Sequence, residues 1–164
     1  MKLHPFAQAF AERDLNGTVA LLADGVIFHS PVIGDTAFEG RPAVAALLEI
    51  VYREISDVDY THGFGDDEAH VLVANARVRG KRVKVTNLLE LAPDGRIREI
   101  WIMARPLVGL VAIAEAIGSG IARREVPSRA PALAVAIKPL AGMAAATDRL
   151  GSRLVAAVNR SARL

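Results

Sequence analysis

The 164-residue chain contains no cysteine, which excludes disulfides, thiolate nucleophiles and cysteine-based metal sites. Its formal net charge is only +2, so no overall field favours nucleic acid as a partner. No apolar run reaches the roughly 18 uninterrupted residues needed to span a bilayer, and charge comes too early in the chain for a secretory signal. These absences predict a soluble, cytoplasmic protein.

What the chain does contain is typical of a folded domain, because 52% of its residues are hydrophobic. The charge divides unevenly along the sequence. Residues 106–164 carry +5, and since the whole chain carries +2, residues 1–105 carry −3. Composition also shifts toward alanine, isoleucine and arginine at this point. We therefore predict a domain over residues 1–106 and a basic, alanine-rich helical extension over residues 107–164.

Hydrophobic periodicity predicts an α+β order of elements. Two short helices are expected within residues 3–23, the second capped near Asn16 or Thr18. A strand over 25–30 and a helix over 39–55, with Pro42 in its first turn, come next. Four strands follow over residues 56–66, 70–80, 81–91 and 96–105, with tight turns at Gly80–Lys81 and Asp94–Gly95. This gives an antiparallel meander. Helices are then expected over 105–125 and 133–164, the latter interrupted near Pro139.

The stretches LLADGVIFHSPV, FEGRPAVAALLE and DGRIREIWIMARP occur in this order. Together they resemble the nuclear transport factor 2-like superfamily, and especially its SnoaL-like members (polyketide cyclase or ketosteroid isomerase-like domains), over residues 3–106. The resemblance implies a cone-shaped α+β domain, in which a curved antiparallel sheet wraps around the N-terminal helices and encloses a pocket. The C-terminal helical extension would cover this pocket or a dimer contact. The superfamily includes isomerases, cyclases, hydrolases, dehydratases and non-catalytic binders, so the fold leaves the activity open.

Two catalytic positions of these families are changed in this chain. Ser30 stands where the isomerase-like members carry a general-base aspartate, and a serine hydroxyl needs an activating base to take a proton from carbon. Ile100 and Ile102 flank Trp101, where the cyclase-like members carry a histidine and an aspartate. The Asp-Arg-Asp arrangement of the epoxide hydrolases has no counterpart. The resemblance therefore implies the fold but not the family's usual acid–base chemistry.

Strand alternation predicts which side chains face the pocket. If Ile100 and Ile102 face inward, the predicted turns place alternate residues of the two preceding strands on the same face. Phe28 and Ser30 are expected inside, with His29 facing away. The predicted ligand-lining residues are Phe28, Ser30, Ala74, Ala76, Leu89, Ile100 and Ile102. The pocket would thus be mostly apolar.

Three polar side chains are the catalytic candidates. Alternation along residues 56–66 turns Tyr60 and His62 inward, so His62 could act as acid or base with Tyr60 assisting it. Asn87 would polarise a substrate carbonyl, near where the isomerases place an oxyanion-stabilising acid, although Leu89 fits that register equally well. The alternative is structural: Tyr60 fills the core, His62 ends a strand, and Asn87 is a hydrogen-bonded core amide.

We expect no metal and no cofactor, because the four histidines are dispersed along the chain. The resemblance implies a homodimer through the outer face of the sheet, where Trp101 and Met103 would lie. Arg149, Arg153 and Arg160 recur at helical spacing, and that amphipathic helix is expected to pack on protein rather than lie on a membrane. No motif predicts nucleic-acid binding.

Two functions stay open from the sequence. The first is a SnoaL-like protein that binds a small hydrophobic molecule in an apolar pocket, either as a binder or as a cofactor-free isomerase, cyclase or hydrolase. The second is a non-catalytic binding or assembly module whose sheet face dimerises.

Overall fold

The computed structural model describes residues 3–32, 34, 37–125, 142–144, 146, 147, 150 and 153. Its elements follow the predicted order. They are α1 (Pro5–Ala11), α2 (Leu15–Ala20), β1 (Leu22–His29), β2 (Phe38–Glu39), α3 (Arg41–Glu54), β3 (Ile55–Gly65), β4 (Ala69–Val78), β5 (Lys81–Leu91), β6 (Ile97–Arg105) and α4 (Leu107–Glu125). The predicted α+β class is confirmed. Most of the helix predicted over residues 133–164, including the segment around Arg149 and Arg160, lies outside the described residues.

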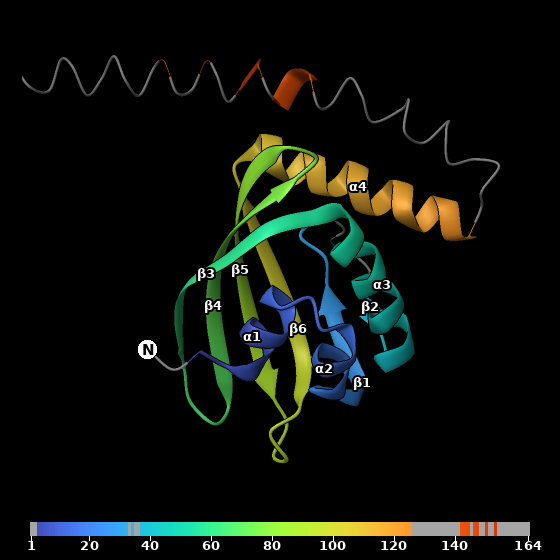
Figure 1. The fold of residues 1–164 in the computed structure, drawn as a ribbon, viewed down its shortest axis with the longest axis vertical. Coiled ribbons are helices and arrows are strands. Elements are labelled where there is room, and N and C mark those ends of the chain that lie inside the picture. The colour runs from blue at the N-terminus through green and yellow to red at the C-terminus, as the bar shows by residue number, and fades with distance from the viewer. Residues whose placement is uncertain are drawn as a thin grey trace, which may run out of the picture.

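One curved, unclosed sheet forms the body of the domain, with strand order β2-β1-β6-β5-β4-β3 (Figure 1). Strands β3 to β6 form the predicted antiparallel meander. β1 pairs with β6 in the parallel direction, with Phe28 opposite Ile100. The sheet is therefore mixed rather than wholly antiparallel. The two-residue strand β2 was not predicted, because so short a strand leaves no periodic signal.

The turn between β4 and β5 fixes which residues of these strands share a face. Val78 pairs with Lys81, so the turn residues are Arg79 and Gly80, not the predicted Gly80 and Lys81. Their φ angles of 48° and 75° suit the right-handed twist of a two-residue hairpin. Moving the turn by one residue shifts each cross-strand partner by two. The predicted facing of β4 is unaffected, because side-chain direction alternates with a period of two.

Strand β3 contains two β-bulges, each of which adds one unpaired residue. The first lies between Ser56 and Asp59, where Asp57 adopts a φ of 52°. The second lies between Tyr60 and His62, which pair with the adjacent residues Ala74 and Val73. Bulges bend a strand and increase its local twist. Each bulge also moves the side chains that follow it to the face opposite the one that regular alternation would give them.

Short helices close the concave face of the sheet. His4 caps α1 by accepting a hydrogen bond at Nδ1 from the Phe6 amide (3.2 Å), and Pro5 begins the helix. Asp14, rather than the predicted Asn16 or Thr18, caps α2 through the Gly17 amide (2.8 Å). Pro42 lies in the first turn of α3, as predicted. The helices bury one core against the sheet, which includes Phe6, Leu22, Val26, Val44, Leu48, Leu72, Leu89, Ile97 and Ile100.

Helix α4 crosses one end of the sheet and packs beside α3 (Figure 1). Glycines allow this close packing: a Cβ on Gly109 would lie 2.4 Å from Val83 Cγ1, and one on Gly120 would lie 2.3 Å from Ile50 Cγ2. Ion pairs join the same elements, with Arg123 at 2.8 Å from Glu54 of α3. The first helix of the predicted extension thus packs on the domain.

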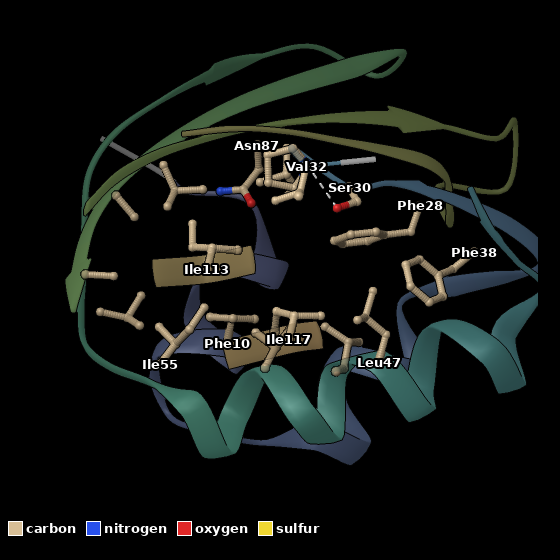
Figure 2. A pocket seen from close by; sticks show the side chains of 18 of the residues that line it. Phe10, Phe28, Ser30, Val32, Phe38, Leu47, Ile55, Asn87, Ile113 and Ile117 are labelled. Atoms are coloured by element: carbon tan, nitrogen blue, oxygen red, sulfur yellow. Dashed lines mark hydrogen bonds between the residues drawn. The ribbon is translucent and has the colours of Figure 1, made fainter. Parts of the chain in front are cut away.

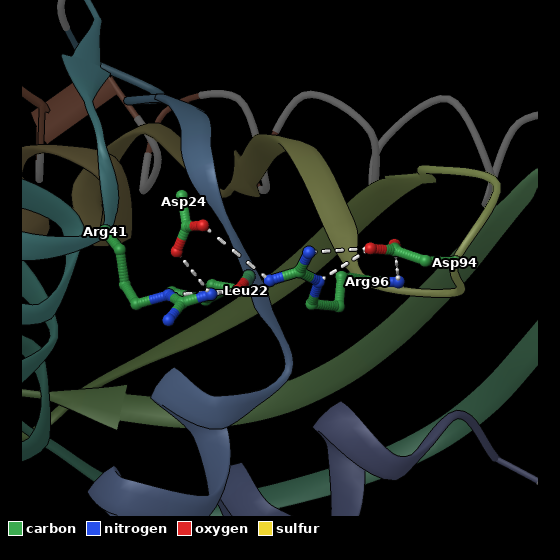
Figure 3. A network of polar contacts seen from close by, with 5 residues as sticks. All are labelled: Leu22, Asp24, Arg41, Asp94 and Arg96. Carbon is green, nitrogen blue, oxygen red and sulfur yellow. Dashed lines mark hydrogen bonds and ion pairs between the residues drawn. The ribbon is translucent and has the colours of Figure 1, made fainter.

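A polar network fixes the opposite end of the sheet (Figure 3). Arg41 of α3 donates two hydrogen bonds to the Leu22 carbonyl (3.1 and 2.6 Å) and pairs with Asp24 of β1 at 2.9 Å. Arg96, in the turn before β6, lies 3.9 Å from Asp24 and 2.7 Å from Asp94. These contacts join α3, β1 and the β5–β6 turn. Most of the charged groups are exposed, so the network positions these elements more than it stabilises them.

Candidate functional site

A cavity of about 320 Å³ lies between the concave face of the sheet and helices α1, α3 and α4 (Figure 2). The sheet contributes side chains from β1 to β6, and the helices cover it from the other side. Its apolar lining includes Phe6, Phe10, Phe28, Phe38, Leu47, Leu48, Val51, Ile55, Val58, Val85, Ile102, Ile113, Ile117 and Ile121. A cavity with such walls favours apolar ligands, because transferring apolar surface from water to the cavity lowers the free energy.

Only three side chains bring hydrogen-bonding groups to the described lining: Ser30, Tyr60 and Asn87. No aspartate, glutamate, histidine, lysine or arginine is among the described residues that line the cavity. A charged ligand group would therefore enter without a counter-ion, which is costly in an apolar site. The lining is matched to a neutral molecule that carries few polar atoms.

Asn87 projects its amide into the cavity from the middle of β5 (Figure 2). Its Nδ2 donates a long hydrogen bond of 3.5 Å to the Leu72 carbonyl. Within the described part of the chain, its Oδ1 has no hydrogen-bond partner. No fully buried side-chain nitrogen or oxygen there lacks a partner, so the Oδ1 atom retains accessible surface. The amide can therefore both accept from and donate to a bound molecule.

Tyr60 lies on β3, with its ring edge-on to Phe10 at 6.4 Å between ring centroids. Among the described residues its hydroxyl has no hydrogen-bond partner. Burial, and secondarily the neighbouring Tyr52, raises the pKa of Tyr60 well above its ordinary value. The hydroxyl therefore stays protonated at neutral pH and acts as a hydrogen-bond donor, not as a base.

Ser30 follows the end of β1 at the rim of the cavity, and its Oγ accepts a hydrogen bond from the Val32 amide (3.2 Å; Figure 2). No described histidine, aspartate or glutamate is hydrogen-bonded to this hydroxyl. It therefore lacks the activating base that a nucleophilic serine requires. The hydroxyl proton remains available to a ligand.

Seven residues were predicted to line a ligand pocket, and the structure places five of them at the cavity. Phe28, Ser30, Ala74, Ala76 and Ile102 all line the cavity. Leu89 and Ile100 face the same side of the sheet, but they are fully buried and do not line it. They pair with each other two residues beyond Asn87 and Ile102, where they belong to the core shared with α1. The side chains of Leu89 and Ile100 thus face inward as predicted, but the cavity ends before it reaches them.

The predicted inward direction of His62 is wrong. The bulge between Tyr60 and His62 adds one residue, so the two side chains lie on opposite faces of β3. His62 is exposed, stacks on Phe64 (6.2 Å between ring centroids) and contacts Thr61 Oγ1 at 3.0 Å. It does not line the cavity. Only Tyr60 and Asn87 of the three catalytic candidates do so.

His29 faces away from the cavity, as predicted. Its Nε2 lies 2.7 Å from Glu99 Oε1, and its ring stacks on Trp101 at 3.4 Å between ring centroids. Trp101 and Met103 remain 40% and 51% exposed on this outer face of the sheet. The cavity and the exposed aromatic surface therefore occupy opposite faces of the same sheet.

Sequence reasoning did not identify the residues by which α4 completes the cavity. Ile113, Ala114, Ile117, Gly118 and Ile121 recur on the helix face that meets the cavity. The extension was expected to cover the pocket or a dimer contact, and the structure places its first helix over the cavity. The described residues contain no group of histidine, aspartate and glutamate that could hold a metal ion. Among the described helices, none is long and apolar enough to cross a membrane.

A family model described as a SnoaL-like domain matches residues 3–100. The chain belongs to the SnoaL-like domain family. Comparison of this SnoaL-like chain with curated proteins gives no match. The match to the family agrees with the order of elements and with the curved sheet enclosing a cavity.

Solved structures similar to this SnoaL-like protein include a steroid delta-isomerase from Pseudomonas aeruginosa. It shares 28% identity, with a TM-score of 0.67 over 76% of this chain and 97% of that one. A second is an uncharacterised protein with a cystatin-like fold from Silicibacter pomeroyi. It shares 26% identity, with a TM-score of 0.65 over 71% of this chain and 84% of that one. A SnoaL-like protein of unknown function from Burkholderia thailandensis shares the fold. Its identity is 15%, with a TM-score of 0.55 over 62% of this chain and 90% of that one.

Proposed function

We propose that this SnoaL-like protein binds a small, neutral, mostly apolar molecule that carries a carbonyl-type oxygen. The observation that carries the proposal is an apolar cavity whose described lining offers only the hydrogen-bonding groups of Ser30, Tyr60 and Asn87. Tyr60 would donate to the ligand oxygen, because its hydroxyl stays protonated and has no described protein partner. Asn87 would donate its second amide hydrogen to the same oxygen or accept from a ligand hydroxyl.

A cofactor-free isomerase is the second candidate, and similarity to a steroid delta-isomerase favours it. Tyr60 and Asn87 would then stabilise negative charge that develops on a carbonyl oxygen. Moving a double bond also requires a group that accepts and returns a proton, and the described lining contains no carboxylate or imidazole. Binding is therefore the better supported function.

Calorimetry with 2-acetylnaphthalene and 2-ethylnaphthalene tests the proposal. The two probes have similar shapes, but only the first carries a carbonyl group. We expect both to bind one site per chain, with the ketone bound more tightly. Ala74→Leu should block both probes by filling the cavity, and Ala69→Leu, at the start of the same strand and outside the cavity lining, should bind normally. If Ala74→Leu does not fold, Ala114→Leu on α4 fills the same cavity.

Two outcomes would count against the proposal. Equal binding to the Ala74→Leu protein would place the probes elsewhere, and equal affinity for the two probes would remove the role of the polar groups. Isomerisation of an unsaturated steroid ketone, followed by ultraviolet absorbance, separates the candidates. Turnover above the solution rate that is lost in the cavity-filled variant would favour the isomerase.

We also propose that the protein forms a homodimer through the outer face of the sheet. Trp101 and Met103 expose a large aromatic ring and a thioether side by side, and such side chains are enriched at interfaces. Stacking of His29 on Trp101 holds the indole in one orientation, which lowers the entropy cost of burying it.

A further inference from the structure

A groove of about 560 Å³ lies at the end of the outer sheet face that is close to the β4–β5 turn. Arg77 of β4, Arg82 and Lys84 of β5, and Arg105 of β6 line it. Counting from the cavity-facing residues Ala74, Val85 and Ile102, strand alternation places all four basic side chains on the opposite face. We propose that this groove binds a small multivalent oxyanion, a phosphate or pyrophosphate group of a small molecule.

The strand register brings like charges together in this groove. Arg77 is directly opposite Arg82, and Lys84 is directly opposite Arg105. Like charges at directly opposite positions destabilise a sheet. Two such pairs side by side are therefore an unfavourable arrangement for the empty protein, and an anion between them would relieve the repulsion.

Acidic residues do not compensate for this charge. Among the described residues that line the groove, Asp57 is the one carboxylate, and its Oδ2 lies 3.1 Å from Arg77 Nε. Within the described residues, the side chains of Arg82, Lys84 and Arg105 form no ion pair or hydrogen bond. The groove thus carries +3, although residues 1–105 as a whole carry −3. The cluster is a local exception to the charge of its own domain.

The available donors suit a tetrahedral oxyanion. Guanidinium groups donate parallel N–H pairs to phosphate oxygens, and the lysine ammonium adds a compact charge. Asn75, which lies directly opposite Lys84, adds an amide donor at the edge of the groove. Because the site is concave and its four basic residues come from three adjacent strands, a small anion fits it better than an extended nucleic acid does.

Isothermal titration calorimetry with pyrophosphate tests this proposal on the full chain. We expect one saturable site. Lys84→Gln and Arg105→Gln should each weaken binding by about tenfold, the usual effect of losing one charged hydrogen bond. Lys81→Gln is the matched control, because Lys81 starts the same strand without lining the groove. It should change the affinity by less than about twofold, the size of a surface-charge effect.

Thermal unfolding provides a second readout. Pyrophosphate should raise the Tm of the wild-type protein, and this rise should be lost in the Lys84→Gln protein. Without pyrophosphate, that variant should unfold at the same or a higher temperature than the wild type, because one repulsive pair has been removed. Unsaturable binding, or equal weakening by all three substitutions, would show only general attraction to a basic surface and would overturn the proposal. Tighter binding of a single-stranded oligonucleotide than of pyrophosphate would overturn it as well.

Discussion

Removing one hydroxyl group from each of two neighbouring tyrosines should have opposite consequences. The Tyr52 hydroxyl lies 2.7 Å from Thr18 Oγ1, and Thr18 is fully buried. Thr18 Oγ1 already donates to the Asp14 carbonyl (2.8 Å), so Tyr52 must be the donor in the contact between them. The Tyr60 hydroxyl has no partner among the described residues and lines the cavity instead.

Tyr52→Phe should therefore reduce the free energy of unfolding by about 1 kcal/mol, the usual net value of one hydrogen bond. For a domain of this size that loss lowers the Tm by about 2–4 °C. Tyr60→Phe should change the free energy of unfolding by less than about 0.5 kcal/mol, because no protein hydrogen bond is lost. It should weaken 2-acetylnaphthalene about tenfold, equivalent to about 1.4 kcal/mol.

Urea unfolding and calorimetry on the two variants measure these quantities. Tyr52→Phe should leave the affinity for the ketone unchanged, and Tyr60→Phe should leave the affinity for 2-ethylnaphthalene unchanged. Equal destabilisation by Tyr60→Phe and Tyr52→Phe would mean that the Tyr60 hydroxyl stabilises the fold and is not free for a ligand. Equal weakening of the ketone and the hydrocarbon by Tyr60→Phe would mean that this hydroxyl does not contact the ketone oxygen.

Two further predictions concern the N-terminal helix and the outer face. Burial, and secondarily His70, holds the pKa of His4 below 6.5, so the unfolded chain takes up a proton first as the pH falls. The free energy of unfolding should therefore decrease as the pH falls below 6.5 and level off below the lowered pKa of His4. The variant His4→Asn keeps a capping acceptor but cannot take up this proton, so its free energy of unfolding should depend less on pH. Urea unfolding at several pH values measures both proteins. Trp101→Lys should convert the proposed dimer to a monomer in sedimentation velocity without affecting probe binding, and an unchanged sedimentation coefficient would exclude this face as the interface.

Much of the meander could be predicted from the sequence because its signals are local. Val85, Asn87 and Ile102 share the predicted face, and Asn87 is opposite Ile102. The predicted two-residue turn at Asp94–Gly95 implies this pairing, but Leu91 pairs with Ile97 next to the turn, and a register shift between Glu90 and Leu91 restores the expected partners. The β4–β5 turn was misplaced by one residue, yet the facing of Ala74 remained correct. A period of two in side-chain direction makes facing insensitive to such an error.

What could not be predicted depends on contacts between distant parts of the chain. The parallel pairing of β1 with β6 joins residues about seventy positions apart, and no local pattern encodes it. The bulge that turns His62 outward is invisible to alternation, because alternation assumes an unbroken ladder. The end of the cavity at Leu89 depends on where α1 meets the sheet, which is likewise a tertiary contact.

The bulge at Thr61 also bears on how the chain selects one pairing of β3 with β4. A regular ladder of the same length would place His62 opposite Leu72, where Gly63 now pairs. Gly63 fits there because a Cβ at this position would lie 2.6 Å from Leu3 Cδ2 and 3.1 Å from Leu72 Cδ2. An imidazole in that space would collide with Leu3, which lies two residues before α1, so this side chain disfavours the register without the bulge. Shortening the Leu3 side chain would remove the nearer of the two contacts that disfavour the alternative register, in which the His62 ring would enter the interior.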